Sequence, residues 1–164
     1  MDGAFGELLA TSEHQALEFF FLGLKDVCGD DVDRDELLYN ASVLAHYAQV
    51  STRTAEGWPT PTSLTSVFDH FVMDSGLRDD REMMEAAGAQ CLLLSGFFED
   101  QMRTRHNIRW YAELGAGFFN RAAANQDSQK RALFFGALSR HFEAWRQRQA
   151  RLSRELRDLP YLLH

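Results

Sequence analysis

The stretch DSQKRALFFGALSRHFEAWRQRQARLSRELRDL, residues 127–159, decides the fold of this chain. Large side chains recur in it at alternating spacings of three and four residues, which is typical of a narrow seam along one α-helix. The seam consists of Phe135, Leu138, Phe142, Trp145, Gln149, Leu152, Leu156 and Leu159. At 1.5 Å per residue, one helix from a cap at Asp127 to Asp158 would be roughly 45 to 48 Å long. The pattern therefore predicts a long C-terminal helix.

A helix of that length is longer than a compact body of 164 residues needs. Its distal part is expected to pack against another helix of the chain or against a second copy. Gln149 is a polar residue on the seam, where coiled coils often set register and oligomeric state, although a tolerated, partly exposed glutamine explains it equally well. Because closed dimers are the commonest soluble assemblies, we expect a homodimer. The predicted interface consists of Phe135, Leu138, Phe142, Trp145, Gln149, Leu152 and Leu156.

The rest of the sequence shows the same helical periodicity, with only three prolines and few runs of β-branched residues. We expect helices from Ser12 to Cys28, with Gly29 as the stop, and from Asp33 to about Ser51. Further helices are expected at about 60–73, from Asp79 or Asp80 through Phe98, and from Asn107 to about Ala124. The sequence thus predicts an all-α fold, a single helical domain over residues 1–164 built as a bundle of five to six helices with a long C-terminal helix.

Composition indicates a globular protein, because 45% of the residues are hydrophobic and 13 are phenylalanine. The two cysteines, Cys28 and Cys91, are expected to be buried free thiols rather than a disulfide. The N-terminal sequence lacks a basic segment followed by an apolar run, and no apolar stretch approaches ~18 residues. We therefore expect a cytoplasmic protein without membrane segments. Arginine supplies 15 of the 17 cations, which favours a bacterial source.

Charge is distributed unevenly along the chain. Residues 1–100 carry 19 acidic and 5 basic side chains, whereas residues 101–164 carry 5 acidic and 12 basic ones. This asymmetry indicates either an anionic partner for the basic end or two parts that neutralise each other. Because the whole chain is negative and shows no helix-turn-helix pattern, we do not expect nucleic acid as a partner. The C-terminal arginines are expected to pair with acidic helices of the same chain or of its partner.

Sequence motifs for catalysis or metal binding are not found. No glutamate is followed by histidine three residues later, the cysteines lack CxxC spacing, and no Gly-x-Ser-x-Gly or phosphate-binding loop occurs. The run Gly115-Ala116-Gly117 lacks the third glycine and the preceding strand of a dinucleotide site, so we interpret it as a closely packed helix interior. No catalytic residue, metal or cofactor is predicted, and an enzyme is not the favoured class.

The segment RTRHNIRWYAE, residues 103–113, is the most suggestive cluster of polar and aromatic residues. Guanidinium groups and aromatic rings together suit an anionic or planar ligand. The candidate ligand-binding residues are Arg103, His106, Arg109, Trp110 and Tyr111. In the favoured interpretation, by contrast, the aromatic residues anchor a helix and the arginines pair with the acidic part of the chain.

Two functions follow from these observations. The leading hypothesis is a non-enzymatic protein-interaction or regulatory module that acts as a homodimer, with a protein partner. The alternative is a helical bundle that binds a small apolar or anionic molecule in a pocket lined by phenylalanines.

Overall fold

A computed structural model describes residues 13–53, 81–104 and 107–157 of the chain. Over these residues seven α-helices and one π-helix occur and no strand, so the all-α bundle is confirmed, with slightly more helices than expected. The chain divides into two compact units. One comprises residues 1–59 and 151–164, and the other residues 60–150. The single domain expected over residues 1–164 stays a prediction.

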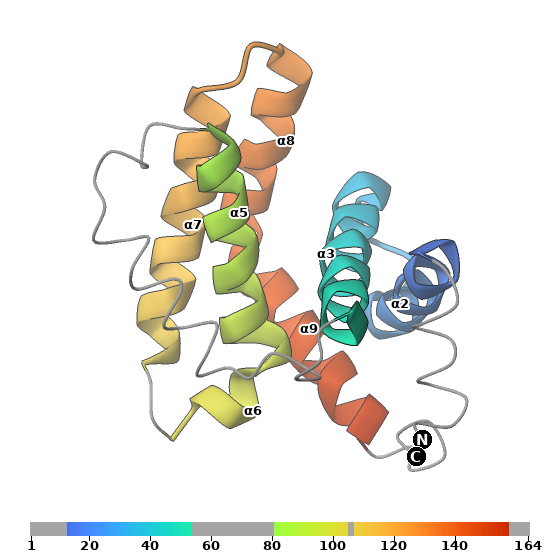
Figure 1. The fold of residues 1–164 in the computed structure, drawn as a ribbon. Helices are drawn as coiled ribbons and strands as arrows, with labels where there is room; N and C mark the ends of the chain where they lie inside the picture. The colour runs from blue at the N-terminus through green and yellow to red at the C-terminus, as the bar shows by residue number, and fades with distance from the viewer. Residues whose placement is uncertain (1–12, 54–80, 105–106, 158–164) are drawn as a thin grey trace. The chain divides into compact units, whose positions relative to one another are not determined.

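In the first unit, α2 (Glu13–Cys28) packs against α3 (Arg34–Arg53), as Figure 1 shows. Helix α2 stops at Gly29, whose φ of 78° is readily available only to glycine. Asp33 caps α3, because its Oδ1 accepts a hydrogen bond from the Glu36 amide at 3.0 Å. Both boundaries lie within two residues of the predicted ones.

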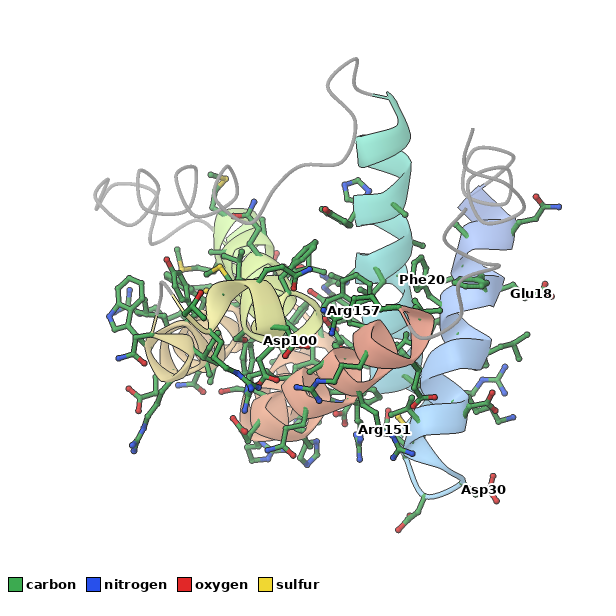
Figure 2. The ribbon with its side chains drawn as sticks, turned by 90° about the horizontal axis from the view of Figure 1, so that it is seen from below. Glu18, Phe20, Asp30, Asp100, Arg151 and Arg157 are labelled. Atoms are coloured by element: carbon green, nitrogen blue, oxygen red, sulfur yellow. The ribbon has the colours of Figure 1, made fainter. Side chains whose placement is uncertain are left out.

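The core of the first unit comes from one face of each helix. Phe20 of α2 is buried, whereas Glu18, two residues earlier, is exposed (Figure 2). Leu152, in the last turns of α9 (Phe142–Arg157), packs on Gly23, where a Cβ atom would lie 3.0 Å from the leucine Cδ1. The other buried apolar residues of this unit are Ala16, Leu24, Leu37, Ala41, Leu44, Ala45, Tyr47, Ala48 and Leu156.

In the second unit, α5 (Arg81–Leu92), α7 (Ile108–Ala124) and α8 (Gln129–Arg140) run side by side, with α7 in contact with both of its neighbours (Figure 1). Helix α5 continues into the π-helix η2 (Leu93–Phe97) and the short α6 (Glu99–Met102). Asn107 caps α7, because its side chain accepts a hydrogen bond from the Trp110 amide at 3.2 Å. The predicted limits of α7 are therefore confirmed.

The prediction of a single helix over residues 127–158 is wrong. The stretch forms α8 and α9, which are separated at His141, where φ is −99° and ψ is 13°. The predicted cap is also wrong, because Ser128 rather than Asp127 accepts the hydrogen bond from the Arg131 amide. The three- and four-residue spacing continues across the break, so periodicity alone did not reveal it.

The helix expected through Phe98 contains a π-helix that the sequence did not predict, and the helix expected at 60–73 lies outside the described residues. Both cysteines are free thiols, Cys91 buried and Cys28 half-buried. Within the described part of the chain, no helix combines the length and the apolar character that crossing a membrane requires.

Candidate ligand pocket

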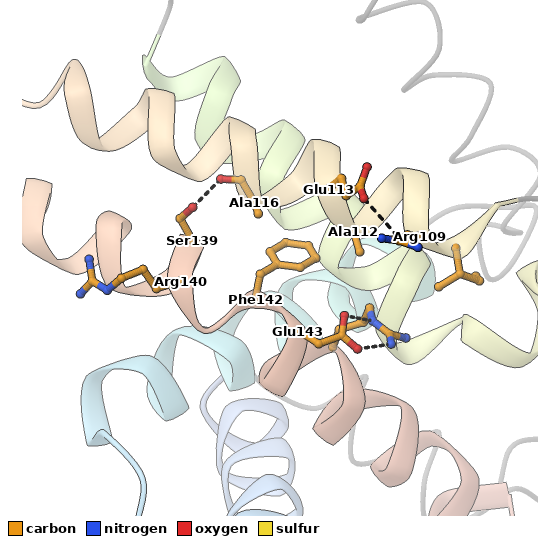
Figure 3. A pocket seen from close by; sticks show the side chains of 10 residues that line it. Arg109, Ala112, Glu113, Ala116, Ser139, Arg140, Phe142 and Glu143 are labelled. Carbon is orange, nitrogen blue, oxygen red and sulfur yellow. Dashed lines mark hydrogen bonds and ion pairs between the residues drawn. The ribbon is translucent and has the colours of Figure 1, made fainter.

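A pocket of about 610 Å³ lies in the second unit, between the first half of α7 and the junction of α8 with α9 (Figure 3). Side chains of both signs of charge surround an apolar floor. The lining residues are Ile108, Arg109, Ala112, Glu113 and Ala116 of α7, and Ser139, Arg140, Phe142, Glu143 and Arg146 of the α8–α9 junction.

The floor of the pocket depends on a close approach of Phe142 to α7. A Cβ atom on Gly115 would lie 2.6 Å from Cε2 of Phe142, closer still to its Cζ, and 2.7 Å from the Cβ atom of Cys91, so only glycine fits there. Next to this contact, the Ser139 hydroxyl donates a hydrogen bond of 2.7 Å to the Ala116 carbonyl (Figure 3). The prediction of close packing is thus confirmed for Gly115, whereas a Cβ atom on Gly117 would meet nothing within 4 Å.

Arg146 forms one wall of the pocket and is almost saturated with hydrogen bonds. Its Nε and Nη2 atoms donate to the two carboxylate oxygens of Glu143 at 3.0 and 2.5 Å (Figure 3). Its Nη1 atom donates to Glu99 at 2.6 Å and to the Ser95 carbonyl at 3.1 Å. A two-pronged arginine–carboxylate contact with further bonds to the same guanidinium has a well-defined geometry. Arg146 therefore fixes the position of Glu143.

The Ser95 carbonyl that accepts from Arg146 belongs to the π-helix η2. The extra residue in a π-turn changes the register of the helical hydrogen bonds, seen here in the bond from the Phe98 amide to the Leu93 carbonyl. Helix α9 crosses this segment closely, because a Cβ atom on Gly96 would lie 3.0 Å from the Arg146 carbonyl oxygen. The pocket wall and η2 are thus connected through one side chain.

The charged groups of this wall stay ionised near neutral pH. The hydrogen bond from Arg146 is the main cause that lowers the pKa of the Glu143 carboxyl below its ordinary value. The same bond is the main cause that raises the pKa of the Arg146 guanidinium. On the opposite wall, Arg109 and Glu113 form an exposed pair with a single contact of 3.2 Å between Nε and Oε1.

The structure does not gather the predicted ligand-binding residues into one site. Of the five, Arg109 alone lines the pocket, and His106 lies outside the described residues. Arg103 pairs with Glu99 and Asp100, Tyr111 is buried, and Trp110 is 42% exposed and in edge-to-face contact with Tyr111. The favoured interpretation, in which aromatic residues anchor the helix and arginines pair with acidic side chains, describes Arg103 and Tyr111 well.

The predicted interface residues are all buried in the single chain. Phe135 and Phe142 contact Phe119, and the fully buried Gln149 packs at Gly96. Leu152 packs on Gly23 in the first unit. The other members of the set, Leu138, Trp145 and Leu156, are at most 7% exposed. These seven side chains thus belong to the core of the chain, and a contact between two copies stays a prediction.

Most of the pocket could not be found from the sequence. Ala112, Ala116 and Ser139 carry no chemical signature, and they meet only because α8 ends at Arg140. The charge asymmetry was a usable signal, since Arg146 joins Glu99 and Arg131 joins Glu85 across the acidic and basic parts of the chain. Within the described residues, no group of three or more His, Cys, Asp or Glu side chains is placed to hold a metal ion.

Comparison of the chain with protein-family models, curated proteins and solved structures gives no match.

Proposed function

We propose that this chain is a non-enzymatic helical binding protein, and that it takes a small organic ligand in the pocket between α7 and the α8–α9 junction. The observation that carries the proposal is the pocket itself, which combines an apolar floor with charged groups held in place at its rim. Its volume of about 610 Å³ falls within the range of ~300 to 1,000 Å³ typical of ligand sites, which in helical bundles often lie between helices.

The state of the charged groups favours binding over catalysis. A general base needs a pKa near the working pH and a free oxygen for the proton. Both oxygens of Glu143 accept bonds from Arg146, and its pKa is lowered, so it is a weak base. Arg146 is itself occupied by Glu143, Glu99 and Ser95. Groups of this kind orient a ligand better than they transfer protons.

A pocket-filling variant tests the proposal. Ala116→Trp places an indole in the pocket, whereas Asn120→Trp places one on the exposed side of α7 and serves as the matched control. We expect wild type and N120W to show saturable shifts of pocket amide signals in a ¹⁵N NMR screen of small organic fragments, and A116W to lose them. Circular dichroism serves as the folding control, because A116W can be compared with the other two proteins only if it keeps its helicity. Equal responses of the three proteins would contradict the proposal.

The second candidate function is the regulatory homodimer. A contact between copies would need exposed apolar side chains, and Leu133 of α8 is 65% exposed. Since the seam is core, a second copy would contact exposed apolar residues such as this one. Light scattering over a concentration series should then show a dimer that Leu133→Gln weakens. A monomer at all concentrations would remove this candidate.

The proposal also includes a location in the cytoplasm. The two free thiols fit a reducing compartment such as the bacterial cytoplasm.

A further inference from the structure

We infer that the outer face of α7 binds the same face of a second copy, with the two α7 helices antiparallel and crossing at Gly117. The inference rests on the second candidate function, the homodimer, and names its interface. It does not depend on the ligand pocket. The outer face lies opposite the buried residues of α7 (Figure 1) and consists of Trp110, Glu113, Gly117, Asn120, Arg121 and Ala124.

Every residue of the outer face is exposed, and none belongs to the core of the chain. Seven residues make about two turns of an α-helix, so positions 110, 117 and 124 follow one another along one line. The line extends over almost all of α7, which ends at Ala124. A second helix can therefore lie against this face along its whole length.

Trp110 is the large apolar side chain of the outer face. It is 42% exposed, and its ring contacts Tyr111 edge to face with 4.8 Å between the centroids. Exposed tryptophan is typical of residues that dominate the binding energy of protein interfaces. In an antiparallel pair that crosses at Gly117, Trp110 lies level with Ala124 of the second copy, because each is seven residues, about 10.5 Å, from the crossing. A large side chain thus meets a small one.

Gly117, near the middle of α7, has no role in the packing of the single chain. A Cβ atom placed on it would meet nothing within 4 Å. Its backbone needs no glycine either, since Gly29 alone among the described glycines has a positive φ. A glycine inside a helix is less stable than alanine. Its position on an exposed face allows a second helix to approach closely at this point.

The charges of the outer face favour an antiparallel pair over a parallel one. Glu113 comes four residues before Gly117 and Arg121 four residues after it, so an antiparallel pair brings each glutamate level with the arginine of the other copy. The two-fold symmetry produces this opposite-charge contact twice. A parallel pair would instead place glutamate against glutamate and arginine against arginine, which is unfavourable.

Both charges are available for a second copy. Glu113 is 68% exposed, and its contact with the exposed Arg109 is a single one, 3.2 Å from Nε to Oε1 (Figure 3). Such a surface pair is weak and is easily exchanged. Arg121 is exposed, and within the described part of the chain no carboxylate pairs with its guanidinium. The outer face therefore carries one loosely held anion and one cation without a counter-charge.

The experiment measures the dimer of the full chain by sedimentation velocity over a concentration series. Because one pair of helices is a small interface, we expect a dissociation constant on the order of 100 µM. Glu113→Arg and Arg121→Glu should each weaken the dimer by about tenfold or more, because each places two like-charge contacts in the interface. The control is Lys130→Glu, which reverses an exposed charge of α8 outside the outer face and should leave the dimer unchanged.

A mixture of the two weakened variants gives the sharpest test. E113R and R121E together restore both opposite-charge contacts, so we expect a heterodimer of about wild-type affinity. This recovery also shows that neither variant had lost its fold. A mixture of E113R with K130E keeps one like-charge contact and should not recover. Gly117→Lys should abolish the dimer while helicity is retained, because two lysines would meet at the crossing point.

The outcomes separate the inference from the function on which it rests. A monomer at every concentration would overturn both the homodimer and the inference. A dimer that responds to Leu133→Gln but to neither charge reversal would leave the homodimer and overturn the inference. A dimer weakened by both reversals but not recovered in their mixture would overturn the antiparallel contact at α7.

Discussion

Helix α7 and the α8–α9 segment both show helical periodicity, yet one is a single helix and the other is broken. Helix α7 runs uninterrupted from its cap at Asn107 to Ala124. The α8–α9 segment is interrupted at His141, although its described seam residues are buried on both sides of the break. A heptad seam therefore indicates which residues are core, and it does not show that one helix carries them all.

The difference has a physical cause in the residues near His141. Phe142 enters the space at Gly115, and Ser139 donates to the Ala116 carbonyl, so the junction is tied to α7 by two contacts. Arg146, one turn further on, ties α9 to η2 and Glu99. A break in a helix removes hydrogen bonds that contribute about 1 kcal/mol each to stability. The tertiary contacts of the junction offset this loss. The break in turn creates the pocket.

The largest effect is expected from Arg146→Met, which removes the tie between α9 and η2. The variant removes the 2.6 Å partner of the Glu99 carboxylate, whose contact with the exposed Arg103 remains, and it removes the donor to the Ser95 carbonyl. Loss of one partner from a buried ion pair costs about 3 kcal/mol, which urea unfolding would measure. Arg151→Met, on the exposed part of α9, is the control and should change the free energy of unfolding by less than about 0.5 kcal/mol.

The same variant has a pH signature. The folded-state pKa of Glu143 is lowered, so its interaction with Arg146 stabilises the protein above the ordinary glutamate pKa, and this stability is lost as pH falls through the folded pKa. In Arg146→Met, the Glu143 pKa measured by NMR should return toward its ordinary value. An unchanged pKa would mean that Arg146 does not hold this carboxylate in solution.

An intermediate effect is expected from Gly115→Ala, which tests the tie between α7 and Phe142. The new Cβ atom would overlap both the Phe142 ring and Cys91, so we expect a loss of about 2 kcal/mol in the free energy of unfolding. Gly117→Ala, two residues away with open space around it, should instead stabilise the protein by about 0.5 to 1 kcal/mol. Thermal unfolding of the two variants measures both changes in stability. Destabilisation by both substitutions would show that close packing does not distinguish Gly115 from Gly117.

Local signals predicted the fold well where they acted alone. Gly29 stops α2, Asp33 caps α3 and Asn107 caps α7, each within one or two residues of the expected position. These boundaries follow from backbone and side-chain chemistry within one turn of helix. The sequence therefore predicted the fold class and several of the helix limits.

Features that depend on distant contacts were not predictable in this way. The π-helix at Leu93–Phe97 and the break at His141 both lie where α9 approaches another element closely, at Gly96 and Gly115. The candidate pocket forms at that break. Among the residues that line it, Arg109 is therefore the only one that the sequence identified as a ligand-binding residue. Phe142 was identified only as a member of the seam.

The smallest effect, and the sharpest distinction between sequence and structure, concerns the start of α8. The sequence indicates Asp127 as the cap, whereas in the structure the Ser128 hydroxyl accepts the Arg131 amide at 3.4 Å. We expect Ser128→Ala to cost about 0.5 kcal/mol, the low end for a lost cap because this bond is long, and Asp127→Ala to cost less. Chemical denaturation of both variants would measure the difference. A larger cost for D127A would restore Asp127 as the cap, and α8 would then begin one residue earlier than the structure places it, whereas α7 would keep its start at Asn107.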